Sequence, residues 1–260
     1  PEVFITDEKG EIISGIGLIG GTKEDPRGVN CGAVQEDNVL GEFNTHPTLC
    51  VKEFIHNITT VMGEMKKIIG VRQLKMVSSH EFARRVLEEA GPKAMEFGCD
   101  PDYNAWTGDT NTSPSAFTNL RTAGGHVHAS FNVQDEDVDS FKAAAMMDYY
   151  LGIPSLLLDG DQRRRAMYGK AGACRPKLKS KGDPYNGVEY RTLSNFWIAS
   201  KELMTWVYGN TEQAILNIHR INEFQQAVDG DTVQNVINEG RVGDAKEIAD
   251  MLNIPMLKGM

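Results

Sequence analysis

One short segment constrains the fold of this chain more than any other: Arg121-Thr-Ala-Gly-Gly-His-Val-His-Ala-Ser130. Its two adjacent glycines permit a turn, and the residues after them favour a β-strand. Alternate side chains of a strand lie on one face, so His126 and His128 should point the same way. The chain is therefore expected to contain a sheet that carries two imidazoles on one face.

A second short segment, Val188-Glu-Tyr-Arg191, also favours a strand. Glu189 and Arg191 are two residues apart, so a carboxylate and a guanidinium share one face of that strand. Imidazole, carboxylate and guanidinium groups are the side chains that a site for cations and phosphates requires. The two segments together indicate such a site on a sheet surface.

A third strand is expected over residues 33–45. Read as one continuous strand, its parity places Glu36 and Glu42 on one face together with two asparagines. Val39 and Phe43 fall on the opposite face. A half-buried strand with carboxylates on its open side suits the binding of a cation.

Periodicity predicts the remaining elements. Apolar residues recur at helical spacing over 48–69, 79–90, 135–151 and 197–227 and, as two helices, over 231–253. Strands are expected over 1–6, 11–19, 74–77 and 94–107, and a loop that could serve as an active-site flap over 107–119. This order, which opens with a hairpin, predicts an α+β fold with helices packed on one face of an antiparallel sheet. We expect one domain, 1–260, with a helical C-terminal part from about residue 197.

The charge balance limits the partners of the chain. Lysine and arginine number 27 against 36 aspartates and glutamates, a net charge of −9, which argues against binding nucleic acid through a basic face. No apolar run approaches the roughly 18 residues of a membrane span, so no membrane partner is expected. The four cysteines are widely spaced and form no Cys-x-x-Cys pair. We therefore expect reduced thiols and a cytoplasmic protein.

A basic stretch over residues 160–181 stands out in this acidic chain. Its cations are mixed with glycines, which would let backbone amides face phosphate oxygens. The stretch therefore predicts a phosphate-binding loop, although no Walker A motif is present. The alternative is a solvated turn.

A cation site is the second chemical expectation. Imidazole together with carboxylates suits Mg²⁺ or Mn²⁺ in a nucleotide site, or Zn²⁺ in a hydrolase. The alternatives are a buried, hydrogen-bonded histidine and solvated surface glutamates. The candidate ligands are Glu2, Glu36, Glu42, His126 and Glu189.

These motifs resemble a known group of enzymes. Residues 124–130 resemble the Gly-x-His-x-His-x-Ser segment of glutamine synthetase, and Glu189-Tyr-Arg191 resembles the Glu-x-Arg strand shared by glutamine synthetase and glutamate-cysteine ligase. Residues 35–44 are similar to their acidic metal-binding strand. The start of the chain and the segment 99–106 resemble carboxylate-amine ligases (COOH-NH2 ligases, type 2) encoded by tailed bacteriophages, over Glu2 to about Trp197.

The resemblance implies a fold and an activity. The fold would be a glutamine synthetase-like antiparallel sheet, curled into a half-barrel funnel with helices on its outer face. The activity would depend on ATP and Mg²⁺ or Mn²⁺. A substrate carboxylate would attack the γ-phosphate, and an amine would displace phosphate from the acyl phosphate to form an amide or peptide bond. The substrates would be small-molecule or peptide carboxylates and amines.

The resemblance also implies roles for individual residues. His126 and Glu189 would hold a metal ion with Glu2, and Glu36 or Glu42 would hold a second one. Arg191 would stabilise the charge that develops in phosphoryl transfer, and Asp102 would accept the amine proton. The residues expected to bind ATP phosphates are His128, Arg163, Arg165, Lys170 and Arg175.

The chain departs from the glutamine synthetase pattern at two places. The first strand of that family offers two acids two residues apart, whereas Phe4 stands at that spacing from Glu2. The carboxylate common after the Glu-x-Arg strand is replaced by Ser194 and Asn195. One metal ligand and the recognition of the amine would therefore come from elsewhere.

Two other classes of function stay open from the residues alone. A metal-dependent hydrolase would use the two imidazoles and carboxylates to activate water, and would need further histidine ligands. Of the other histidines, His46 alone adjoins the acidic strand. A non-catalytic phage virion or scaffold protein could also retain a ligase fold.

Overall fold

The computed structural model describes residues 1–95, 102–112, 118–132 and 136–257. The chain forms two compact units, each built from three segments. Unit 1 comprises Pro1–Cys99, Ser113–Ala123 and Asn195–Thr205, and unit 2 comprises Asp100–Thr112, Gly124–Ser194 and Trp206–Met260. That both units form one catalytic domain stays a prediction. Within the described ranges, no helix has the length and apolar character needed to cross a membrane.

Unit 1 is built on an antiparallel sheet with the order β2-β1-β5-β4-β3 and with β6 also paired to β1. β1 and β2 form the hairpin expected at the start of the chain. The strands are β1 (Glu2–Thr6), β2 (Ile12–Ile13), β3 (Arg27–Val29), β4 (Gly32–Asp37), β5 (Leu40–Thr45) and β6 (Gln73–Lys75).

The expectation of one strand over 33–45 is wrong, because β4 and β5 form a hairpin there. Asp37 pairs with Leu40, so Asn38 and Val39 make a two-residue turn, and Asn38 adopts the positive φ of 55° that such turns need. The turn reverses the chain and resets the parity of the side chains. Carboxylates on either side of it must therefore be placed from the pairing of the strands.

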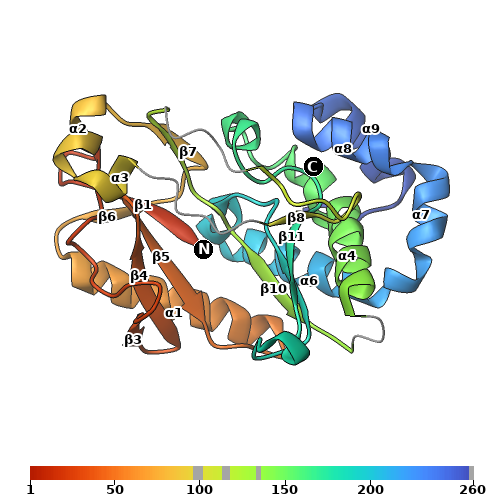
Figure 1. Ribbon diagram of the computed structural model, residues 1–260, viewed down its shortest axis with the longest axis horizontal. Helices are drawn as coiled ribbons and strands as arrows, with labels where there is room; N and C mark the ends of the chain where they lie inside the picture. The colour runs from red at the N-terminus through yellow and green to blue at the C-terminus, as the bar shows by residue number, and fades with distance from the viewer. Residues whose placement is uncertain (96–101, 113–117, 133–135, 258–260) are drawn as a thin grey trace. The chain divides into compact units, whose positions relative to one another are not determined.

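The helix α1 (Val51–Ile69) confirms the amphipathic helix expected over 48–69. It packs on β4 and β5, as Figure 1 shows. Its buried residues, Ile58, Val61, Met65 and Ile69, recur at the spacing of one helical face. This burial covers one face of β4 and β5.

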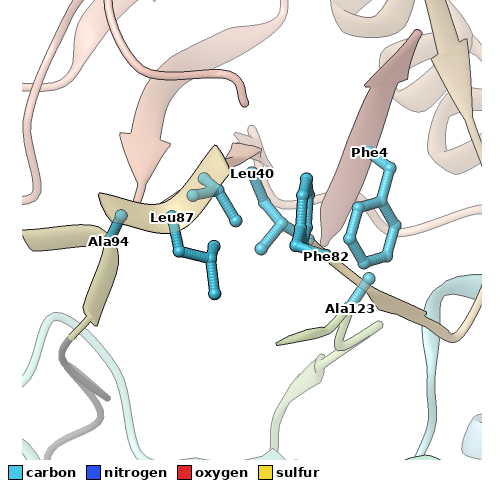
Figure 2. Close-up of a cluster of buried hydrophobic side chains, with 7 residues drawn as sticks. Phe4, Leu40, Phe82, Leu87, Ala94 and Ala123 are labelled. Atoms are coloured by element: carbon cyan, nitrogen blue, oxygen red, sulfur yellow. The ribbon is translucent and has the colours of Figure 1, made fainter. Parts of the chain in front are cut away.

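A second apolar cluster in unit 1 joins β1 and the β4–β5 turn to a small sheet of β7 (Ser79–Glu81) and β9 (Leu120–Thr122) and to the short helices α2 (Arg84–Glu89) and α3 (Pro92–Met95). Figure 2 shows most of its side chains. Its buried members are Phe4, Val39, Leu40, Phe82, Leu87, Ala94 and Ala123. The helix expected over 79–90 is wrong in its first turn, because residues 79–81 pair with β9 and leave only α2 helical.

Unit 2 contains an antiparallel sheet with the order β10-β12-β11-β8. The helix α4 (Glu136–Met147) packs on β11 and β12. The strands are β8 (Tyr103–Asn104), β10 (Val127–Ser130), β11 (Ala173–Lys177) and β12 (Gly187–Tyr190). Strands are thus confirmed at both functional segments, but His126 precedes β10 and Arg191 follows β12. Of the strand pair expected over 94–107, Tyr103–Asn104 forms β8, but residues 94–95 belong to the helix α3, so the expectation is wrong there. Residues 96–101 of that pair and residues 113–117 of the loop expected over 107–119 lie outside the described residues.

The helix expected over 135–151 ends in a π-helical turn, η1 (Asp148–Gly152), before the short helix α5 (Ile153–Ser155). Single π turns are frequent at functional sites because the extra residue redirects side chains. Here the turn begins at Asp148, a fully buried carboxylate.

The C-terminal part is helical, as expected, but the helix over 197–227 is interrupted near Asn217, which has φ −100° and ψ 9°. The two helices expected over 231–253 are confirmed, with Asp229 capping the first and Gly240 ending it. The helices and turns are η4 (Asn195–Ala199), α6 (Lys201–Leu216), η5 (Ile218–Arg220), α7 (Ile221–Ala227), α8 (Gly230–Glu239) and α9 (Val242–Met251). Antiparallel sheets covered by helices confirm the α+β class.

Candidate active site

Three of the predicted site residues lie in adjacent strands of unit 2. β10 pairs with β12, and their register sets His128 opposite Glu189. β11 flanks the other edge of β12 and sets Arg175 opposite the same glutamate. Residues directly opposite each other in adjacent strands share a face of the sheet. The three side chains therefore form a row across one face.

Glu189 lies at the centre of a buried ion network. Its side chain is 6% exposed, and Oε1 accepts a hydrogen bond from Nη1 of Arg191. Nη1 of Arg175 lies 3.5 Å from Oε1, and Nζ of Lys177 lies 3.2 Å from Oε2. Burial alone would raise the pKa of Glu189, but the cations, Arg191 foremost, outweigh it and lower the pKa to about 2. The carboxylate is thus ionised, and each oxygen faces a cation.

Arg191 directly follows β12, and its guanidinium is held by several groups. Nε donates to Oδ2 of Asp102 at 2.9 Å, and Nη1 lies 3.2 Å from Nδ1 of His126. Burial, followed by the charges of Arg191 and Arg164, holds the pKa of His126 well below its usual value. The imidazole is therefore neutral and accepts this hydrogen bond. Asp102 also accepts, through Oδ1, from Nδ2 of Asn111 at 2.8 Å.

His128 contacts a tyrosine that the sequence did not single out. Its Nδ1 lies 2.7 Å from the hydroxyl of Tyr185, which comes from the loop between β11 and β12. Burial raises the pKa of this phenol beyond its usual range. The hydroxyl therefore stays protonated and donates to Nδ1, which places the proton of a neutral imidazole on Nε2.

The basic loop does not act as one group. Arg163 is 58% exposed and pairs with Asp161 at 2.8 Å, and Lys170 is also exposed. Arg165 is 4% exposed, and its Nη2 donates to Oγ of Ser155 at 3.1 Å. The phosphate-binding role of Arg165 stays a prediction.

The glycines of residues 160–175 do not all serve a phosphate either. The N–H of Gly172 donates to Oδ2 of Asp148 at 2.6 Å. The same carboxylate accepts from the indole N–H of Trp106 and from the hydroxyl of Tyr190, each at 2.7 Å. Gly172 has φ +71°, and a Cβ there would lie 2.7 Å from the indole of Trp106. The phosphate-cradle interpretation is therefore wrong for Gly172, which is needed for close packing around a buried carboxylate.

Unit 1 holds the other predicted carboxylates. Glu2 pairs with Glu42, and Glu42 with Gln35, so these three side chains share a face. Nε2 of Gln35 donates to Glu42 at 2.6 Å. Glu36 lies on the opposite face, because it pairs with Gly41 next to Glu42. The expectation that Glu36 and Glu42 share a face is therefore wrong.

Glu36 has a structural role in unit 1. Its Oε1 accepts the backbone N–H groups of Ile19 and Gly20 at 3.3 and 3.0 Å. These bonds tie the glycine-rich loop after β2 to β4. One oxygen of the Glu36 carboxylate is thus engaged by the loop.

Glu2 and Glu42 in unit 1 suit a divalent cation better than the surroundings of Glu189 do. Among the residues that the structure describes, no three His, Cys, Asp or Glu side chains gather into a metal-binding group. Both oxygens of Glu189 face cations, so its surroundings do not fit a metal ion. Glu2 and Glu42 are paired across adjacent strands, and carboxylate oxygens are the ligand type that a divalent cation takes, so a cation site there stays a prediction.

The predicted site residues thus fall into two groups. Unit 2 brings together Asp102, His126, His128, Arg175, Glu189 and Arg191, and unit 1 pairs Glu2 with Glu42. That the two groups act on one substrate stays a prediction. Tyr185 and Asp148 are additions that the structure makes. Lys177 and Arg164 belong to the predicted basic stretch, and the structure places them against Glu189 and against main-chain carbonyls.

A comparison with protein families identifies one match. Residues 114–236 match the model of a family described as phage phiEco32-like COOH.NH2 ligase-type 2. The matched segment includes the strands that carry His128 and Glu189, and it confirms the family resemblance over those residues. No curated protein and no solved structure matched the chain.

Proposed function

From this match to a family named for carboxylate-amine ligation, we propose that the chain is an ATP-dependent ligase that forms an amide or peptide bond. One observation carries the proposal. The family match includes two sequence-separated motifs, and the structure pairs them strand to strand with His128 opposite Glu189. A ligase needs imidazole, carboxylate and guanidinium groups on one surface, and this sheet presents them together.

The proposed reaction has two steps. An oxygen of the substrate carboxylate attacks the γ-phosphorus of ATP, ADP leaves with the bridging oxygen, and an acyl phosphate forms. The amine nitrogen then attacks the acyl carbon, the C–O bond to phosphate breaks, and the amine loses a proton to the surroundings. Each step moves negative charge onto phosphate oxygens, so fixed cations are the main requirement.

The cations of unit 2 meet that requirement. Arg175 and Lys177 flank Glu189 within 3.5 Å, and they can turn from the carboxylate to phosphate oxygens. His128 would donate Nε2–H to a phosphate, because Tyr185 bonds its other ring nitrogen. Among the residues of the basic loop, the exposed Arg163 and Lys170 can also reach an anion.

Arg191 is the residue we assign to transition-state charge. It is 5% exposed, and Nε is held by Asp102, which leaves the guanidinium with little freedom to move. A preorganised cation stabilises developing charge without reorganising during the reaction. Asp102 holds Arg191 and Asn111 with its two oxygens, so we assign it to orienting Arg191 instead of accepting the amine proton.

We propose that Mg²⁺ arrives with ATP as part of the substrate. Glu2 and Glu42 of unit 1 are the residues that would hold a divalent cation. The hydrolase alternative loses support, because both oxygens of Glu189 face cations. A non-catalytic virion or scaffold protein would show no turnover in a ligase assay, so the test below also distinguishes that alternative.

The test uses hydroxylamine as a general amine. Purified protein, Mg²⁺-ATP and a panel of amino acids and peptides are incubated with hydroxylamine, and hydroxamate and ADP are measured. We expect both products in equal amounts for at least one carboxylate, and ¹⁸O transfer from that carboxylate to phosphate. Failure to bind ATP by calorimetry, with and without Mg²⁺, would overturn the proposal. ADP formation without hydroxamate would instead favour hydrolysis.

A further inference from the structure

Arg164, the middle residue of the arginine triplet, is buried against the chain that follows β12. Its side chain belongs to the 3₁₀ turn η2 (Arg163–Ala166) and is 4% exposed. Nη1 donates to the carbonyl of Thr192 at 2.8 Å, and Nη2 donates to the carbonyl of Arg191 at 3.1 Å. One planar guanidinium thus binds two successive carbonyls, a geometry that lysine cannot reproduce.

The surrounding chain leaves room for this guanidinium. Gly169 has φ +68°, and a Cβ at that position would overlap Nη1 of Arg164. A Cβ at Gly124 would lie 3.2 Å from Nη2. Gly169 therefore permits the close approach of Arg164, whereas a Cβ at Gly124 would first meet the imidazole of His126, at 2.5 Å.

The main chain of Arg191 is held from both sides. Its N–H donates to the carbonyl of Ala173 at 2.8 Å, and its carbonyl accepts from Arg164. At the far end of its side chain, Nε is bonded to Asp102. The position of the guanidinium is therefore set by its backbone as well as by its ion pairs.

We propose that Arg164 is a positioning residue for Arg191, and that it fixes the backbone from which the catalytic guanidinium extends. The catalytic part of this inference rests on the proposed function. Arg164 itself contacts carbonyls and acts through Arg191. A displacement of about 1 Å in a catalytic group can cost about 10²-fold in rate, so a clamp on its backbone matters for turnover.

The test compares Arg164→Lys with Arg121→Lys. Arg121 is a matched control, because it is 3% exposed and its guanidinium also binds main-chain carbonyls, those of Thr118, Leu120 and Ala94. Both variants lose a buried guanidinium, so a general loss of stability should appear in both. Only Arg164→Lys should change the surroundings of Arg191.

The first readout is the Nε–H cross-peak of Arg191 in a ¹⁵N NMR spectrum, assigned by its loss in Arg191→Lys. We expect Arg164→Lys to shift or broaden this peak and Arg121→Lys to leave it unchanged. The second readout is hydroxamate formation. Arg164→Lys should lower kcat at least about 10-fold with the KM for ATP within about threefold, and Arg121→Lys should keep kcat within about twofold.

The two readouts separate this inference from the proposed function. An unchanged Arg191 peak in a folded Arg164→Lys protein overturns the positioning role, whatever the activity. Equal losses of kcat in both variants overturn it as well, since they indicate a general effect of stability. If the wild-type protein forms no hydroxamate, the proposed function fails, and the NMR comparison alone decides whether Arg164 positions Arg191.

Discussion

Tyr190 donates its hydroxyl hydrogen bond to Oδ1 of Asp148 at 2.7 Å. Tyr190 stands between Glu189 and Arg191 in the chain, so its side chain leaves the opposite face of the strand from theirs. The carboxylate of Asp148 is fully buried and also binds Trp106 and Gly172. The face that carries the charged site is therefore supported from behind by a buried polar network.

Asp148 gives the protein an unusual dependence of stability on pH. Burial raises its pKa from 3.8 to about 7, although its hydrogen bonds oppose that shift. The folded state thus binds a proton more tightly than the unfolded chain, so this group makes the free energy of unfolding fall as pH rises from about 4 to about 7. This difference in the pKa of Asp148 between the folded and unfolded states corresponds to roughly 4 kcal/mol in the free energy of unfolding.

Asp148→Asn should remove this contribution of Asp148 to the pH dependence of stability. In urea unfolding from pH 4 to pH 7.5, the wild-type protein should lose stability relative to Asp148→Asn as pH increases. Asp250→Asn, an exposed position near the end of α9, is the control and should run parallel to the wild type. Parallel curves for wild type and Asp148→Asn would show that folding does not raise the pKa of Asp148.

Two glycines of the basic loop should respond differently to alanine. Gly172→Ala should destabilise the protein by about 1–3 kcal/mol, because the added Cβ would meet Trp106 and Asn104. Gly160→Ala should change stability by less than about 0.5 kcal/mol, because nothing lies within 4 Å of its Cβ. Thermal unfolding measures both. Equal effects would contradict the packing role of Gly172.

Substitutions on the two faces of the β4–β5 hairpin should have different effects on the affinity for divalent cations. Glu42→Gln should weaken Mn²⁺ binding about 10-fold or more, because it removes one of two opposed carboxylates. Glu36→Gln should leave Mn²⁺ affinity within about twofold, since Glu36 lies on the other face and binds backbone amides. Calorimetric titration with Mn²⁺ decides. A larger loss in Glu36→Gln would refute the placement of the cation.

Arg191→Ala should lower turnover far more than nucleotide affinity. Its guanidinium is held by Asp102 in a fixed position, which suits a group that acts on the charge of the transition state. We expect kcat to fall by about 10²-fold or more while the Kd for ATP changes less than about fivefold. Single-turnover kinetics and calorimetry measure the two quantities. The opposite pattern would assign Arg191 to ground-state binding.

The sequence predicted those parts of the fold that depend on local periodicity. The apolar spacing of α1 and the alternation around His128 and Glu189 are local signals, and the structure confirms those elements. The single strand over 33–45 was wrong because parity cannot be counted through a turn at Asn38. A residue with positive φ, such as Asn38, is only weakly predictable from the sequence.

The supporting residues of the site could not be predicted in the same way. Asp148 and Tyr190 are 42 residues apart, and Arg164 reaches a carbonyl 27 residues away. Such contacts leave no periodic pattern. One signal was present for Asp148, which interrupts a run of apolar residues from Met146 to Leu151. The glycines near Arg164 resembled a phosphate loop, because close packing and ligand approach both demand the same residue.

The two-residue turn at Asn38 and Val39 has a consequence for how such proteins diverge. An insertion of one residue there would shift the register of β5 against β4, and Glu42 and Phe43 would exchange sides. Gene changes as small as a single codon in this turn could therefore abolish or create an acidic surface while every acidic residue is retained. Alignments of related chains should be checked for turn length before an acid is equated with its counterpart.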